Sequence, residues 1–464
     1  MRRSRRQLLA ALAAGGGLLA GCAAREPDDA TAGGAPAETP GSPPSSADTD
    51  ASDRPTATPR SPEPLPVAGG WPQYGANAGH TGVSTSSGVP DDGRAYWHLR
   101  RVRSGPAVLA DGRLVHYAKL GADPDAPVTK TRTREPDAGT AHPVYGDPYV
   151  VVRDASDGRI QWSKPLDGPG AGWPAVAGGR AVAAVNGQIT AYDAATGAVE
   201  WSKDHSERVV GDPTVTGDAL VVPLQGTVHG DATLQEPQVQ CYDLTDGRPR
   251  WSADPPKRAN RVAVANDTVV VVSAGWDGTG VVLSHSLARG TERWRARVPG
   301  DSFEGPVVAA GRVYLASSDG VLHALSVDDG ETRWTREFER RPAGVAADDD
   351  AVYVGAGGRF AALAAEDGSV RWSREELPGA VAPPAVGDGV VYVGTAGESA
   401  RLYALDAVDG TERWASAPFP FQTVEGDMMM AGVESQPALG DGAVYVSAAD
   451  GLYAFGPRSD RKEE

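Results

Sequence analysis

A glycine followed four residues later by a tryptophan recurs eight times along this chain. Most successive tryptophans lie roughly 40 residues apart, a period that is typical of radial β-repeats when turn residues and one fixed aromatic recur with it. The pairs are Gly93/Trp97, Gly158/Trp162, Gly197/Trp201, Gly247/Trp251, Gly290/Trp294, Gly330/Trp334, Gly368/Trp372 and Gly410/Trp414. This repeat constrains the fold more than any other feature of the sequence.

Eight short hairpins recur with the same period. Each has an apolar run, a turn of Gly, Asp or Asn, and a run rich in Val and Tyr, as in VAAGRVYLAS from residue 308. Turns of this composition accept positive φ and join antiparallel strands. A third apolar run and a second turn then lead to the tryptophan segment, so each unit predicts the four strands of one propeller blade.

The glycine and the tryptophan of each pair have structural explanations. Glycine suits the turn because it has no Cβ to strain. The tryptophan on the outer strand can bury on the order of 200 Å² against small residues of a neighbouring blade. We therefore predict that all eight tryptophans are structural and do not stack on a ligand.

The two ends of the repeat complement each other. The first pair, Gly93/Trp97, has no hairpin ahead of it, and the last hairpin, 438–456, has no tryptophan after it. The strand Ala95–Arg100 is therefore expected to complete the last blade and close the ring. The prediction is an all-β, eight-bladed propeller of four-stranded antiparallel blades without an exposed sheet edge.

The N-terminus resembles an export signal. Arg5 and Arg6 directly precede an apolar stretch, as in twin-arginine signals. That stretch, Leu8–Ala20, is too short and too rich in Gly and Ala for a typical membrane span. It ends in LAGC, which resembles a lipobox and predicts that Cys22 is lipidated and begins the mature chain. An ordinary signal peptide with a chance cysteine is the alternative.

Composition divides the chain into four parts. Residues 1–21 are the predicted twin-arginine lipoprotein signal, 22–70 the lipidated cysteine and a disordered tether, 71–457 the propeller, and 458–464 a charged tail. The tether is rich in Pro, Ser, Thr and Asp, and such a composition cannot repay the entropy of ordering. As a flexible coil it would typically span ~40 Å.

Charge and cysteine content exclude several classes of function. The formal net charge of −17 argues against nonspecific nucleic-acid binding. Besides Cys22 the chain holds only Cys241, so it has neither a disulfide framework nor a CxxC motif. The eight histidines are scattered without metal-ligand spacing, and the motifs of serine hydrolases, zinc proteases and nucleotide-binding loops are missing.

The repeat resembles the pyrroloquinoline-quinone-type (PQQ-like) propeller repeat, whose core is Ala-x-Asp-x-x-x-Gly-x-x-x-Trp. The resemblance covers residues 71–457, and the opening WPQYGANAGHTG at 71–82 is similar to the lead-in segment of such proteins. The repeat aspartate is present at Asp154, Asp193, Asp243 and Asp406 and replaced by Ser286, Ser326, Ala364 and Val89.

This resemblance raises the question of quinoprotein chemistry. Enzymes of the family place a disulfide of adjacent cysteines over the cofactor, bind Ca²⁺ through Glu, Asn and Asp, and use a catalytic Asp. Cys22 and Cys241 cannot form that disulfide, and no residues match the calcium ligands by motif. We therefore expect neither PQQ nor calcium, no catalytic residues, and no bound metal.

Long insertions point to one functional face. In a four-stranded meander, the loops between the second and third strands share a face with the links between blades. The long segments 121–148, 224–238, 274–280 and 415–434 all belong to these two classes. Loops on a rigid scaffold commonly carry binding sites, although surface variation without a ligand would look the same.

Residues just ahead of each inner strand should ring the channel mouth on that face, with Ser104 at the first blade. Trp173 and Trp276 lie outside the repeat position, so their aromatic surface suits a protein or ligand contact. Trp173 could equally pack at the start of a blade. The candidate binding-face residues are Trp173, Trp276, Asp212, Arg261, Glu304, Arg341, Gln436, Phe419 and Phe421.

Two functions fit these observations. The first is a non-catalytic, monomeric lipoprotein on the extracytoplasmic face of the cell membrane, which binds or scaffolds other envelope proteins. It would resemble the outer-membrane assembly factor B propellers and contact the membrane through its lipid anchor alone. The second is a quinone or small-molecule binding protein, enzymatic or sensory, that uses the channel mouth.

Overall fold

The computed structural model describes most of the chain from residue 69 to residue 456. The residues left out within that range are 89, 91, 101–102, 121–130, 133–142, 145–146, 169–171, 206–208, 226–235, 260, 275–277, 301–302, 376, 378–381, 398, 420–421, 425–426, 430–431 and 434. The predicted signal and tether, with Arg5, Arg6 and Cys22, lie outside the described residues. In the part that is described, no helix is long and apolar enough to cross a membrane.

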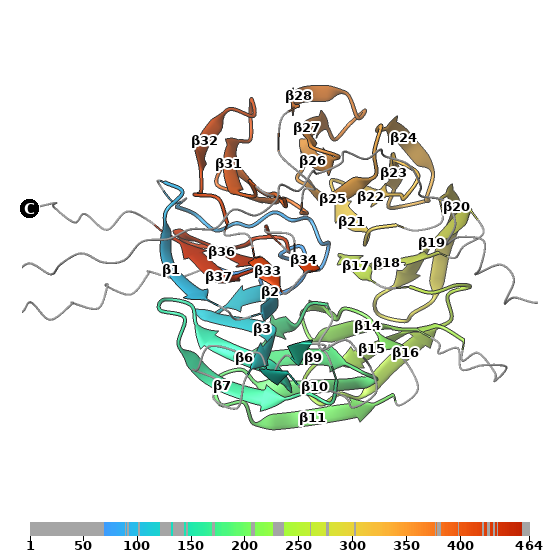
Figure 1. Cartoon of the computed structure of the whole chain (residues 1–464). Helices are drawn as coiled ribbons and strands as arrows, with labels where there is room; N and C mark the ends of the chain where they lie inside the picture. The colour runs from blue at the N-terminus through green and yellow to red at the C-terminus, as the bar shows by residue number, and fades with distance from the viewer. Residues whose placement is uncertain are drawn as a thin grey trace, which may run out of the picture. The chain divides into compact units, whose positions relative to one another are not determined.

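The described chain forms eight antiparallel blades around a central axis, as Figure 1 shows. This confirms the predicted eight-bladed, all-β propeller. From the axis outward, blade 1 holds β2 (Arg103–Ala110), β3 (Arg113–Leu120), β6 (Asp147–Asp154) and β7 (Ile160–Pro165); blade 2 holds β8 (Ala175–Ala177), β9 (Arg180–Val185), β10 (Gln188–Asp193) and β11 (Val199–Asp204). Blade 3 holds β13 (Thr214–Thr216), β14 (Ala219–Gln225), β15 (Gln238–Asp243) and β16 (Pro249–Ala253); blade 4 holds β17 (Val262–Ala265), β18 (Thr268–Ser273), β19 (Thr279–Ser286) and β20 (Glu292–Pro299).

The remaining blades follow the same order. Blade 5 holds β21 (Val307–Ala309), β22 (Arg312–Ala316), β23 (Val321–Ser326) and β24 (Thr332–Glu337); blade 6 holds β25 (Pro342–Ala347), β26 (Ala351–Ala356), β27 (Arg359–Ala364) and β28 (Val370–Arg374). Blade 7 holds β29 (Ala385–Gly387), β30 (Val390–Gly394), β31 (Leu402–Asp406) and β32 (Glu412–Ala415); blade 8 holds β35 (Ala438–Gly440), β36 (Ala443–Ala448), β37 (Gly451–Phe455) and β1 (Ala95–Arg100). Short strands outside this scheme are β12 (Val209–Val210), which pairs with β14, and the pairs β4 (Thr131–Arg132) with β5 (Pro143–Val144) and β33 (Gln422–Val424) with β34 (Asp427–Met429).

Two faces of the ring follow from this order. The turns between the first and second strands and between the third and outer strands lie on one face, which we call the tight-turn face. The connections between second and third strands and the links between blades lie on the other, the long-loop face. The connection from β3 to β6 and the link from β32 to β35 both belong to the long-loop face.

Each tryptophan of the repeat joins its blade to the next one. At seven seams its indole N–H donates to the backbone carbonyl that follows the third strand of the next blade, and Trp414 donates instead to Pro90, which precedes β1 of blade 8. The pairs are Trp97–Ala155 (3.3 Å), Trp162–Ala194 (2.9 Å), Trp201–Leu244 (2.9 Å), Trp251–Leu287 (2.6 Å), Trp294–Val327 (2.8 Å), Trp334–Ala365 (3.0 Å), Trp372–Ala407 (3.0 Å) and Trp414–Pro90 (2.8 Å). The ring is thus held by one repeated contact, and each indole combines apolar area with a satisfied donor.

The repeat glycine belongs to the same contact. At six seams, a Cβ on the glycine would lie 2.5–2.8 Å from an atom of the tryptophan ring of the preceding blade. These glycines also have φ between +69° and +75°, a region that side chains other than glycine rarely adopt. The glycine therefore makes the turn and also leaves room for the neighbouring indole. The six are Gly197, Gly247, Gly290, Gly330, Gly368 and Gly410.

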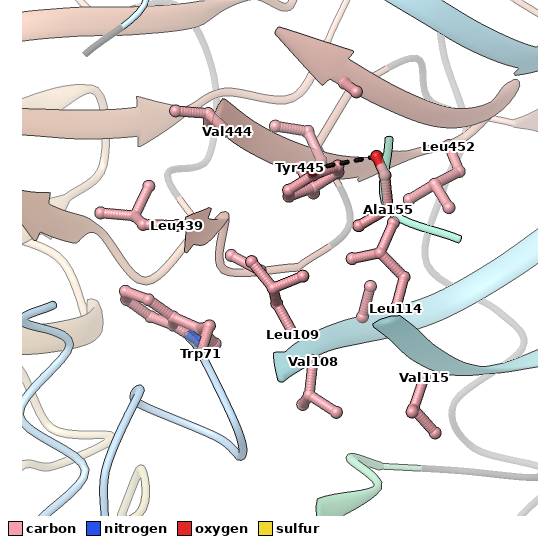
Figure 2. Packing of buried hydrophobic residues seen from close by; sticks show 14 of the residues in the cluster. Trp71, Val108, Leu109, Leu114, Val115, Ala155, Leu439, Val444, Tyr445 and Leu452 are labelled. Carbon is pink, nitrogen blue, oxygen red and sulfur yellow. Dashed lines mark hydrogen bonds between the residues drawn. The ribbon is translucent and has the colours of Figure 1, made fainter. Parts of the chain in front are cut away.

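The seam between blades 8 and 1 closes the ring. Strand β1 pairs with β37 in antiparallel register, so the predicted closure by the Trp97 strand is confirmed. The carbonyl of Ala155 accepts the Trp97 indole and also the Tyr445 hydroxyl at 3.0 Å (Figure 2). Leu109, Leu114 and Leu452, which Figure 2 draws around this seam, are fully buried.

The lead-in segment, residues 71–88, meets the inner strand or inner turn of every blade in chain order. It lies at the tight-turn end of the channel, because its partners sit beside the turns between first and second strands. The contacts are Trp71–Leu109 (2.7 and 2.8 Å), Pro72–Val176 (2.7 Å), Gln73–Val215 (2.7 and 2.9 Å), Ala78–Val264 (2.6 Å), Gly79–Val308 (2.7 Å), Thr81–Ala347 (2.7 Å), Gly82–Val386 (2.8 Å) and Ser87–Gly442 (2.8 Å). The lead-in segment is therefore part of the core, and Trp71 is fully buried.

The contact between glycine and indole can be tested with a matched pair of substitutions. Gly368→Ala would force alanine into the left-handed backbone region, at a φ of +71°, and place its Cβ 2.7 Å from the Trp334 ring. Gly311 has a similar φ of +70°, but nothing lies within 4 Å of its Cβ position. We expect Gly311→Ala to lower the free energy of unfolding by about 1–2 kcal/mol, the cost of the backbone alone. Gly368→Ala should cost about 1–3 kcal/mol more because of overpacking. Urea unfolding measures both, and equal losses would contradict the contact.

Candidate functional site

Four charged residues on successive blades form one network beside the axis. Asp212, Arg261, Glu304 and Arg341 precede the inner strands of blades 3, 4, 5 and 6, and we call them the central charge network. Arg261 Nε donates to Asp212 Oδ2 at 2.5 Å, and its guanidinium lies 3.9 Å from Glu304. Arg341 donates to Glu304 Oε1 at 2.7 Å. The structure thus brings four of the predicted ring residues together, with two charges of each sign.

Asp212 and Arg261 are held deep in this network. The backbone N–H of Trp173 donates to Asp212 Oδ1 at 2.9 Å, and Asp212 is buried. A Cβ on Gly172 would lie 2.0 Å from the same oxygen, so only glycine fits beside the carboxylate. The Arg261 guanidinium lies 4.2 Å from the centre of the Tyr74 ring, a cation–π contact supplied by the lead-in segment.

The charges in the network control the proton affinity of its members. Burial disfavours the charged form of Arg261, but Asp212, Tyr74 and Glu304 outweigh it and raise the pKa of the guanidinium above its ordinary value. Burial also raises the pKa of the Tyr74 hydroxyl, and Arg261 opposes that shift in part. Both groups therefore keep their ordinary charge states at neutral pH.

His80 of the lead-in segment lies behind this network. Its ring is 1% exposed, meets the Tyr74 ring edge-on at 5.0 Å, and places Nε2 3.2 Å from Thr214 Oγ1. Burial first, and then the positive charge of Arg261, lower the pKa of His80 to about 3. His80 is therefore a neutral, packed histidine at physiological pH.

Several residues predicted for an open binding face are buried instead. Trp173 is 4% exposed and packs edge-on against Tyr74 at 5.4 Å, so it is a core residue at the start of its blade. Phe419 is 4% exposed and packs on Tyr453. Gln436 is 2% exposed, accepts the Gly75 N–H and donates to the carbonyl of Pro384. Trp173 thus follows the alternative of packing at a blade start, where Tyr74 covers it, whereas the placements of Phe419 and Gln436 correct the prediction.

The remaining candidates are either outside the described residues or partly exposed. Trp276 and Phe421 are outside the described residues, and Ser104 is described only through its backbone in β2. Of the central charge network, Arg341 has a side chain that is 49% exposed, and Glu304 and Arg261 are about one quarter exposed. Among the described residues, the accessible part of the predicted channel mouth is therefore charged, and these charges pair with one another.

Sequence reasoning missed the contribution of the lead-in segment to this site. Tyr74, His80 and Gln73 reach the inner strands of blades 3 and 4. They lie outside the repeat, so the repeat period could not predict where they lie in the fold. The available signal was a polar and aromatic segment, rich in glycine, directly before the first blade. Within the described residues, no group of three or more His, Cys, Asp and Glu side chains is arranged to hold a metal ion.

The buried state of His80 predicts how stability depends on pH. An unfolded histidine takes up a proton near pH 6.5, whereas folded His80 stays neutral down to about pH 3. The unfolded state therefore binds more protons in this window, and stability falls as the pH is lowered through it. We expect His80→Gln to flatten the fall in the free energy of unfolding between pH 7 and 4.5, measured by urea titration. His116, whose pKa is also lowered to about 3, contributes equally to both proteins and cancels. Parallel curves would contradict the placement of His80.

Comparisons with known proteins agree with this architecture. The family model described as outer membrane protein assembly factor BamB matches residues 146–234, 235–375 and 330–459, which together exceed half of the chain. The serine/threonine-protein kinase AfsK of Streptomyces griseus is 32% identical over 151 residues, or 28% of this chain and 18% of the kinase. The outer membrane protein assembly factor BamB of Yersinia pestis is 26% identical over 111 residues, or 22% of this chain and 28% of that protein. The matched part thus spans less than a third of either relative.

A solved structure shows the same fold at low identity. The quinohemoprotein alcohol dehydrogenase from Comamonas testosteroni superimposes with a TM-score of 0.61 and 13% identity, covering 85% of this chain and 82% of that chain. Because the identity is low, this likeness concerns the fold alone. The family match, together with the repeated blade geometry, shows that the chain belongs to the outer membrane protein assembly factor BamB family of PQQ-like β-propellers.

Proposed function

We propose that this protein is a non-catalytic scaffold of the cell envelope, anchored through a lipid on Cys22 and exported by the twin-arginine route. Membership of the BamB family supports a protein-binding role and an envelope location. The propeller binds other envelope proteins through its long-loop face, as a monomer, and meets the membrane only through its anchor. It does not bind nucleic acid.

One observation carries this proposal. Trp71 is fixed to Leu109 by two backbone hydrogen bonds at the tight-turn end, and a Cβ on Gly69 would touch Asp441 in a turn of the same face. The described chain therefore begins at the tight-turn face. The long connections lie on the opposite face, where loops on a rigid scaffold commonly bind partners.

The central channel favours a scaffold over a small-molecule site. The lead-in segment occupies its tight-turn end, and the central charge network pairs its own charges beside the other end. A ligand at the channel mouth would have to separate Arg341 from Glu304 or displace Tyr74 from Arg261. The protein accordingly works without PQQ or Ca²⁺.

Site-directed photo-crosslinking in intact cells tests the binding face. A crosslinking residue at position 339, in the link between blades 5 and 6, should yield discrete adducts with the same envelope proteins in repeated experiments. The same residue at position 408 is a matched control, because Val408 is 84% exposed on the tight-turn face. Cys22→Ala should move the protein to the soluble fraction and reduce adducts. Equal adducts from both positions, or none, would contradict the proposed face.

A thermal-shift titration of the purified mature protein tests the absence of a cofactor. With PQQ and Ca²⁺, we expect the melting temperature to stay within experimental error and the protein to be colourless. A saturable rise in melting temperature would show specific binding to the folded state. That result would replace the scaffold with the quinone-binding alternative, and Arg341→Gln would then locate the site by reducing the shift.

A further inference from the structure

A groove of about 400 Å³ opens between blades 5 and 6. One wall is the end of β24 and the link that follows it, with Arg336, Phe338 and Arg340. The other wall is the surface of blade 6 that faces blade 5, with Ala361 and Ser373. This volume lies within the range of small-molecule and peptide side-chain sites.

The shape of the groove follows from small residues on blade 6. Ala361 pairs with Ser373 across β27 and β28, so this part of the sheet presents little bulk to the seam. At one end, the Trp334 indole fills the seam and Arg336 donates to the carbonyl of Gly368 at 3.1 Å. Beyond these contacts the seam stays open.

The groove offers an apolar contact. Val370 is 44% exposed and is one of three large hydrophobic side chains that are exposed among the described residues. The other two, Val199 and Val408, do not line the groove. Phe338, which is half-buried, lines the opposite wall. A branched apolar side chain entering between Val370 and Phe338 would bury surface on both walls, and buried apolar area favours association.

Unpaired charges of both signs surround this apolar contact. One nearby pair, Arg359 with Glu375 at 2.9 Å, is an exception. In contrast, the side chains of Arg340, Glu337 and Glu339 are exposed and make no hydrogen bond or ion pair with another described residue. An occupant with one acidic and one basic side chain would therefore find a complement for each, and complementary charges set orientation and specificity.

We propose that this groove binds an extended segment of a partner protein in which an apolar residue stands between an acidic and a basic one. The apolar side chain sits between Val370 and Phe338, the acidic one faces Arg340, and the basic one faces Glu337 and Glu339. The proposal rests on the scaffold function and names a contact through which that function operates.

Synthetic peptides test the groove directly. The probes are fluorescein-labelled nonapeptides with Leu between Asp and Lys, in both charge orders, and a version with Ser in place of Leu. Fluorescence polarisation with the purified mature protein should show saturable binding of one charge order, lost when Ser replaces Leu. Val370→Asp and Arg340→Glu should each weaken binding by about tenfold or more, as expected at a central contact.

Two controls make the result specific. Val408→Asp is the same substitution at an exposed valine on the tight-turn face, and it should leave peptide binding within about twofold, as expected for a distant site. Replacing Asp by Lys in the peptide should restore binding to Arg340→Glu. Binding that survives both Val370→Asp and Arg340→Glu, or no binding by any peptide, would contradict the proposal that the groove binds this kind of segment.

The same variants separate this proposal from the scaffold function. If photo-crosslinks from position 339 persist in Val370→Asp while the peptides fail to bind, the scaffold function is supported and peptide binding in the groove is contradicted. If peptides bind as expected but the crosslinks are absent in cells, peptide binding in the groove is supported and the scaffold function in the envelope is contradicted.

Discussion

The contact between one blade's tryptophan and the next blade's glycine turn is the interaction on which the ring depends. Each indole donates a hydrogen bond across the seam and packs where six of the glycines leave space for it. The same two residues therefore specify a turn and a blade-to-blade spacing. The indole hydrogen bond recurs at all eight seams and the contact with a repeat glycine at six of them, and β1 closes the ring by completing blade 8.

The lead-in segment makes the two ends of the channel different. It satisfies inner-strand amides at the tight-turn end of the channel, which is also where the described chain begins. The buried histidine, Tyr74 and the pairing of Arg261 with Asp212 then make the axis a packed region instead of an open site. Binding is consequently expected at exposed features of the opposite face and at the seams, of which the groove between blades 5 and 6 is the described example.

Repeat periodicity predicted the fold well but the site only in part. The spacing of Gly and Trp gave the blade number, and the unmatched ends of the repeat gave the closing strand Ala95–Arg100. Counting residues ahead of each inner strand also found the neighbours Asp212, Arg261, Glu304 and Arg341. It could not tell that Trp173 and Gln436 are covered, because the covering residues belong to a segment without a repeat. The groove depends on side-chain size across a seam, as at Ala361 and Val370, which a one-dimensional pattern does not report.

Hydrogen exchange of the inner-strand amides tests the packed axis most directly. The amides of Val176, Val264 and Val308 donate to carbonyls of the lead-in segment at 2.6–2.7 Å. In the mature protein they should exchange as slowly as amides in the second strands of the same blades, because both would need the propeller to open. Exchange as fast as that of exposed turn amides would mean that the lead-in segment does not occupy the channel, which would contradict the packed axis.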